Sequence, residues 1–260
     1  MKHMCFTKLC AFLLGGTLLL RAASAGEPAP GPGKATPIEP AEDSEGLFGG
    51  IGVEWSAGYD THYVFRGELL QENTAWTQFS WDIALTESLS LNVTPWFLQD
   101  LDSDYSEFDL NAGLTLESGG FGYSLGYAGY FYPRGALGEG EGIDDEHEMW
   151  LSVTREFGPL SATVLGAYNF TRDAAYFELA AEWPLKVTEW LTLTPGVILG
   201  ADTDYFDEGT DFNHVGVQLS AAFQLTPWCH LVPYIAANFP FGHLDTGDNL
   251  YGGVKVAIVF

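Results

Sequence analysis

Twelve segments of the chain alternate apolar side chains with polar or small ones, and this two-residue period constrains the fold more than any other feature. In the last segment, Val254, Val256, Ile258 and Phe260 fall on one side of a strand. A soluble sheet ending on such a strand would leave an apolar face and a free edge exposed. In a closed membrane barrel the edge pairs with the first strand and the apolar side meets lipid. We therefore predict an all-β fold, a closed antiparallel transmembrane β-barrel.

The lengths and number of the segments agree with this prediction. Each is close to the 9–11 residues that a tilted membrane strand needs, and an even number of strands leaves both ends of the barrel chain on one side. We also expect residues 61–67 to continue the alternation of the first strand and to project past the bilayer. The twelve predicted strands cover about 49–60, 73–86, 89–99, 106–117, 121–132, 147–157, 160–170, 175–186, 190–201, 212–225, 229–240 and 250–260.

The connections between these segments alternate in length. Five are short, such as Glu87-Ser88 and Gly158-Pro159, whereas most of the others are longer and acidic, such as 135–146 and 202–211. Outer-membrane barrels have short periplasmic turns and longer outer loops. The alternation therefore predicts which end of the barrel faces the periplasm.

Aromatic residues gather near both predicted ends, as the two interfacial girdles of a membrane barrel require. On the turn side these are Trp183, Trp190, Trp228 and Phe260, and on the loop side Tyr63, Phe97, Phe131, Tyr168, Phe170, Phe177 and Phe239.

The first 46 residues are predicted to lie outside the barrel. Residues 1–25 combine Lys2 and Lys8, an apolar stretch and Ala23-Ser24-Ala25, which is the pattern of a secretory signal peptide. Residues 26–46 are rich in proline and glycine and read as a linker. The barrel is then 47–260, and its one cysteine, Cys229, cannot form an intrachain disulfide.

The formal net charge of the chain is −25, from 35 acidic and 10 basic residues. Such a chain repels nucleic acids and anionic lipid surfaces, so neither is an expected partner. Solubility, or adaptation to a salty medium, is an alternative partial cause of the charge.

Polar side chains with inward parity are predicted to line a narrow, water-holding lumen rather than a packed plug. Twelve strands lie between barrels filled by side chains and the wide aqueous porins. Because the lining is acidic, it would favour cations, although any single acid could instead pair with Arg66, Lys255 or a bound divalent ion. The predicted pore-lining residues are Glu54, Asp60, His62, Arg66, Asp82, Asn92, Asp109, Asn111, Glu178, Glu182, His214, Gln218, Asn238 and Lys255.

The run Tyr59-Asp-Thr-His-Tyr-Val-Phe-Arg-Gly67 resembles the signature near the start of the TorF-type family of bacterial outer-membrane porins. The order of signal peptide, aromatic strands and terminal Phe260 is also similar, although Glu68-Leu-Leu-Gln71 departs from the usual Ser/Gln-rich continuation. The resemblance implies a channel in the bacterial outer membrane. Arg66 could neutralise Asp60 or Asp82, and an ion pair is the favoured role for it over direct solute contact.

These features favour a channel for passive diffusion of small hydrophilic solutes or cations over other functions. No Gly-x-Ser-x-Gly motif occurs and three of the histidines have inward parity, so we do not expect an enzyme such as a membrane hydrolase. A structural or surface-interaction barrel without an open pore is the alternative. We expect no metal or cofactor, contact with outer-membrane lipid, and recognition of Phe260 by the barrel-assembly machinery. The sequence sets neither the solute nor the oligomeric state.

Overall fold

The computed structural model describes residues 51–133, 144–206, 209–242, 244 and 247–260. The predicted signal peptide 1–25, the linker 26–46 and the barrel residues 47–50 lie outside this part of the chain. No stretch of the described residues forms a helix long and apolar enough to cross a membrane.

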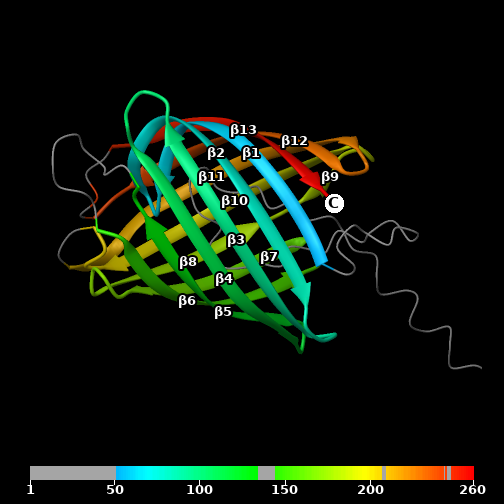
Figure 1. Ribbon diagram of the computed structural model, residues 1–260, viewed down its shortest axis with the longest axis horizontal. Coiled ribbons are helices and arrows are strands. Elements are labelled where there is room, and N and C mark those ends of the chain that lie inside the picture. The colour runs from blue at the N-terminus through cyan, green and yellow to red at the C-terminus, as the bar shows by residue number, and fades with distance from the viewer. Residues whose placement is uncertain (1–50, 134–143, 207–208, 243, 245–246) are drawn as a thin grey trace, which may run out of the picture.

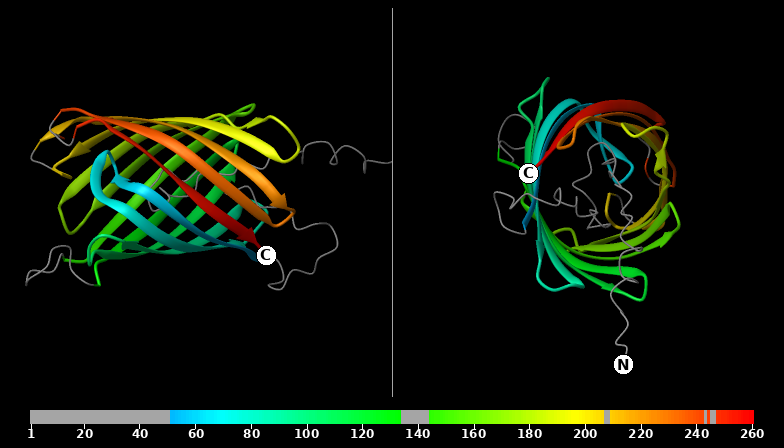
Figure 2. Two further views of the ribbon diagram at one scale, coloured as in Figure 1. Left: turned by 90° about the horizontal axis from the view of Figure 1, so that it is seen from above. Right: turned by 90° about the vertical axis from the view of Figure 1, so that its right-hand side faces the viewer.

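The described residues form one closed antiparallel β-barrel (Figure 1; Figure 2, right). Each strand pairs with the next in sequence, except that β8 and β9 both pair with β10. Strand β13 closes the ring by pairing with β1, with Trp55 opposite Ile258. The strands are β1 Ile51–Phe65, β2 Glu68–Ala84, β3 Leu89–Asp100, β4 Ser106–Ser118, β5 Phe121–Phe131, β6 Glu146–Phe157, β7 Leu160–Asn169, β8 Ala174–Glu182, β9 Leu185–Lys186, β10 Leu191–Thr203, β11 Thr210–Thr226, β12 Cys229–Pro240 and β13 Asn249–Val259.

The short strand β9 continues β8, because both pair with β10 and only Trp183-Pro184 separates them. The barrel therefore has the twelve strands that the sequence predicts, with the eighth interrupted. Proline has no backbone N–H to give to a strand ladder, which accounts for the break at Pro184.

Polar side chains face the inside of the barrel and apolar ones face outward, the reverse of a soluble protein. Along β6, Ser152 is 1% exposed, whereas its neighbour Leu151 is 56% exposed. The turn-side aromatics predicted for one girdle, including Trp190 and Trp228, are exposed on the outside. Such a surface is stable in lipid, where an exposed apolar exterior carries no free-energy penalty and the closed strand ladder provides hydrogen-bond partners for the backbone N–H and C=O groups.

The first hairpin departs from the prediction. Strand β2 begins at Glu68, so β1 and β2 meet in a tight turn at Arg66-Gly67, and the pairing register shifts between Tyr63 and Val64. Tyr63 is completely buried, and its ring packs 5.7 Å from that of Trp96. The hairpin tip, residues 63–67, therefore folds into the barrel instead of projecting past the bilayer, and Tyr63 does not belong to the outer aromatic girdle.

Candidate functional site

The fourteen residues predicted to line the pore lie on the inner face of the strands, except Arg66, which lies in the hairpin tip. Half of them are buried and half are partly exposed to the lumen. The buried ones are Asp60, Arg66, Asp109, Asn111, Glu178, His214 and Asn238. The partly exposed ones are Glu54, His62, Asp82, Asn92, Glu182, Gln218 and Lys255.

Toward the turn side, the inner face carries small hydrogen-bonded groups of polar side chains. Asn92 donates to Asp82 at 2.8 Å and to Ser80 at 2.9 Å. Across the barrel wall, Gln218 donates to Glu182 at 3.3 Å. The bonds of Asn92 link the neighbouring strands β2 and β3, whereas the bond of Gln218 joins β11 to β8 across the intervening β10. Both groups leave the carboxylates facing the lumen.

Asp60 is held by two aromatic donors. The indole of Trp76 and the hydroxyl of Tyr234 each donate to its carboxylate at 2.6 Å. A Cβ added to Gly253 would lie 2.2 Å from an Asp60 oxygen, so this position needs glycine. Sequence reasoning identified Asp60 but missed Trp76 and Tyr234, which have the same inward parity as their polar neighbours.

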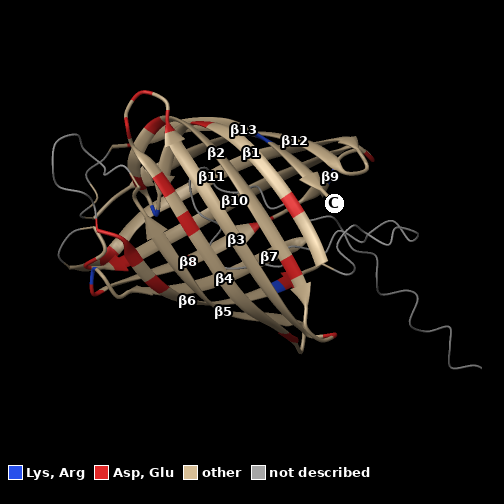
Figure 3. Ribbon diagram, viewed as in Figure 1, with Lys and Arg blue, Asp and Glu red and all other residues tan. Residues whose placement is uncertain are grey.

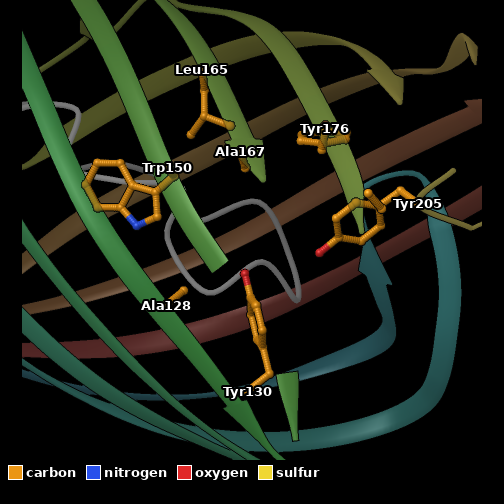
Figure 4. Packing of buried hydrophobic residues seen from close by; sticks show 8 residues of the cluster. Ala128, Tyr130, Trp150, Leu165, Ala167, Tyr176 and Tyr205 are labelled. Atoms are coloured by element: carbon orange, nitrogen blue, oxygen red, sulfur yellow. The ribbon is translucent and has the colours of Figure 1, made fainter. Parts of the chain in front are cut away.

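The hairpin tip crosses the lumen on the side of the longer loops. In the strand order, β8 is half the circumference away from β2, yet the tip reaches it. The Arg66 guanidinium lies 4.4 Å from the ring centroid of Tyr176 on β8 and 4.7 Å from that of Tyr205, in the loop after β10. Figure 4 shows Tyr176 and Tyr205 beside this hairpin, with Tyr130 projecting from another part of the wall.

Arg66 forms a buried ion pair with Glu148 on β6. Two nitrogens of the guanidinium donate to the two carboxylate oxygens, each at 2.7 Å. The hydroxyl of Tyr205 donates to the same carboxylate at 3.0 Å and that of Tyr130 at 3.3 Å. The predicted role of Arg66 in an ion pair is thus correct, but the predicted partners Asp60 and Asp82 are wrong. Inward parity gives the face of a residue, not which groups meet across the lumen.

A second ion pair involves Glu146, which is two residues before Glu148 on β6. Arg172, in the turn after β7, donates to the two oxygens of Glu146 at 2.6 and 2.8 Å, and to the carbonyl of Tyr205 at 3.0 Å. Burial lowers the pKa of Arg172, but the hydrogen bond and charge of Glu146 outweigh it, so the pKa is raised. This pair is not predictable from the sequence, because a single arginine in an acidic chain has many possible partners.

Aromatic side chains fill the space around the tip. One cluster contains Tyr130, Trp150, Tyr176 and Tyr205 with Phe65 packed against it, and another contains Tyr63, Trp96 and Tyr105. Beside the second cluster, the hydroxyl of Tyr105 donates a hydrogen bond to Glu107 on β4 at 2.5 Å. Asp109, also on β4, is fully buried. The expectation of a lumen without packed side chains is therefore wrong for its loop-side half.

Acidic residues outnumber basic ones over the barrel and its longer loops (Figure 3). Among the described residues, Arg66 is the one buried Lys or Arg, against eight buried Asp and Glu side chains. In the same part of the chain, no three His, Cys, Asp or Glu side chains come together as metal ligands. The inner face therefore offers a field of carboxylates with few counter-charges.

Comparison with known proteins identifies the fold. No family model and no curated protein matches the chain. Its structure is similar to that of an outer membrane channel from Pseudomonas putida F1, with a TM-score of 0.52 and 13% identity, covering 81% of this chain and 94% of that one. It is also similar to the KdgM porin in complex with disordered oligogalacturonate, with a TM-score of 0.52 and 8% identity, covering 80% and 99%. At these identities the likeness shows the fold alone.

The chain thus has the twelve-stranded barrel fold of outer-membrane channels. Its apolar exterior and closed ladder are those of a barrel that spans a membrane, and barrels of this kind belong to bacterial outer membranes.

Proposed function

We propose that the protein is an outer-membrane channel for passive diffusion of small hydrophilic solutes, with a preference for cations. The observation that carries this proposal is the inner face, where buried and half-buried carboxylates far outnumber Lys and Arg. Carboxylates along a pore attract cations and repel anions. The similar structures are named as a channel and a porin, which supports transport and gives no reason to expect catalysis.

The hairpin tip is proposed as the constriction of this channel. It crosses the lumen, and its Arg66 is fixed to the opposite wall through Glu148 and Tyr176. Solutes would pass beside the tip, so their size is limited there. The resemblance to TorF-type porins stays a prediction, and the last five residues of the run that carries it, 63–67, form the tip.

One observation favours the alternative of a barrel without an open pore. The tip and the aromatic clusters around Tyr63 and Tyr130 occupy the loop-side half of the lumen. In that case the outer loops would be the functional part, for contacts at the cell surface.

Conductance of the purified protein in planar bilayers separates the two functions. The proposal expects discrete current steps, and a reversal potential in a salt gradient that shows cations carrying most of the current. Absence of current from protein that shows the heat-modifiable gel mobility of a folded barrel would favour the structural alternative. A preference for anions would contradict the charge argument.

A further inference from the structure

The guanidinium of Arg66 lies in a cage that other parts of the barrel build. The wall supplies Glu148 from β6 and Tyr176 from β8, and the loop after β10 supplies Tyr205. These three side chains are between 1% and 2% exposed. The remaining wall of the cage is Phe65, next to Arg66 in the hairpin tip, at 4.8 Å.

The chemistry of the cage suits a cation with planar or compact N–H donors. A carboxylate accepts two parallel hydrogen bonds from a guanidinium, and aromatic faces attract cations more strongly once water is excluded. Because acids exceed bases on the inner face, the field of the lumen also draws cations to this place.

The cage keeps its shape through contacts that do not involve Arg66. Tyr205 and Tyr130 both donate hydrogen bonds to Glu148, which orients its carboxylate. The ring of Tyr176 stacks on that of His214, with 6.5 Å between the ring centroids, and it meets the ring of Tyr205 edge-on, with 6.3 Å between the centroids. A cage held in this way is organised for a cation before the cation arrives, and such preorganisation lowers the cost of binding.

The same arrangement occurs again on β6. Glu146 takes the guanidinium of Arg172, which also lies 5.5 Å from the ring of Tyr205. In both cases the arginine comes from a connection at the loop end, and the acid comes from the barrel wall. The difference is that Arg66 is carried by a hairpin that crosses the lumen.

We propose that the cage of Glu148, Tyr176 and Tyr205 is a binding site for solutes that carry a guanidinium or ammonium group, with Arg66 as its resident occupant. A solute of this class competes with Arg66 for Glu148, and its binding releases the hairpin tip from the wall. This inference deepens the proposed cation-preferring channel and rests on it for the solute's access to the lumen.

Chemical rescue of an emptied cage tests the inference. The full chain carrying Arg66→Ala is folded in detergent micelles, and the temperature at which half of it loses folded gel mobility is measured with and without guanidinium chloride at a few millimolar. We expect guanidinium to raise this midpoint, by about 2 °C or more once its concentration is ten times its Kd. Nonspecific guanidinium lowers protein stability, so the sign of the shift separates the two effects.

Three controls define the site. Urea, the neutral planar analogue of guanidinium, should give no rise. The double variant R66A/E148Q should lose the rise, because the carboxylate that anchors the cation has become an amide. The wild-type protein should show a much smaller rise, since Arg66 already fills the cage.

The inference is overturned if guanidinium gives R66A no rise, or if the double variant responds equally. If R66A does not fold without added ligand, its refolding yield is measured with guanidinium and with the same concentration of urea. A higher yield with guanidinium supports the inference, and equal yields overturn it. The result is independent of the channel proposal, because the midpoint needs no current. Rescue without any conductance would leave the cage standing and refute the channel, whereas cation-selective conductance without rescue would refute the cage.

Discussion

The imidazole of His214 on β11 lies directly against Gly67 in the hairpin tip, so that a Cβ added to Gly67 would come within 2.6 Å of two ring atoms. The backbone φ of Gly67 is 92°, a conformation that other residues rarely adopt. Next to this contact, Asn238 on β12 donates a 2.7 Å hydrogen bond to the Gly67 carbonyl. The tip is thus fixed to β11 and β12 at Gly67, where the surrounding atoms leave no room for a side chain.

Gly67→Ala is expected to dislodge the hairpin tip. The positive φ alone costs about 1–2 kcal/mol for alanine, and the clash with His214 adds about 1–3 kcal/mol. The measurement is the temperature at which folded gel mobility is lost, which should fall clearly below that of the wild type. Gly120→Ala is the matched control, because Gly120 has a φ of 79° but nothing within 4 Å of an added Cβ.

The double variant G67A/H214A should recover part of that loss, because removing the imidazole relieves the clash while the backbone strain stays. Equal midpoints for G67A and G120A would show that the contact with His214 does not hold the tip.

Glu148→Gln is expected to release the tip by a different route. The substitution keeps the shape of the side chain but leaves the buried Arg66 charge without its counter-charge, which typically costs about 3–5 kcal/mol. Single-channel conductance should rise as the tip moves away from the wall, and the unfolding temperature should fall. Asp82→Asn serves as the control, since Asp82 accepts a hydrogen bond from Asn92 and faces the lumen near the turn end of β2, at the opposite end of that strand from the tip. A conductance for E148Q equal to that of the wild type would mean that the tip does not limit the current.

The strands could be predicted from the sequence because lipid imposes one rule on every one of them. Leu151 must face out and Ser152 in, and this alternation holds along a strand whatever its neighbours are. The hairpin tip could not be predicted in the same way. Its alternation through Thr61 and Tyr63 fits a strand that continues upward as well as one that folds inward. The deciding features, the register shift and the contact with Glu148, depend on groups far away in the chain.

The pore-lining set shows the same limit. Parity was enough to put Glu178 and Asn238 on the inner face, since direction along a strand is a local property. The pairing of Arg66 with Glu148, 82 residues later, depends on how far each side chain lies along the barrel axis and on the bend of the hairpin. Neither quantity has a period in the sequence.

Leu151→Lys tests the orientation of the outer surface. Leu151 is 56% exposed on β6, and a lysine facing lipid near the middle of a bilayer costs about 2–4 kcal/mol. Folding yield into lipid vesicles, followed by gel mobility, should therefore fall. Leu101→Lys is an unusually close control, because Leu101 is 57% exposed but lies in the loop after β3, outside the strands. If both variants fold with equal yield, the outer face of β6 does not contact lipid.

Neutralising lumen acids away from the tip tests what sets ion preference. Glu54 and Asp82 both face the lumen and are partly exposed, so the double variant E54Q/D82N removes two charges without touching the buried ion pair of Arg66 and Glu148. The reversal potential in a salt gradient should move toward that of a nonselective pore. The difference from the wild type should be larger in dilute salt, because the Debye length is about 30 Å at 0.01 M and about 10 Å at 0.1 M. Glu189→Gln changes an exposed acid in a short turn and should leave the potential almost unchanged. An unchanged potential in E54Q/D82N would mean that cations are not selected by the turn-side wall, and that any selection comes from the acids around the hairpin tip.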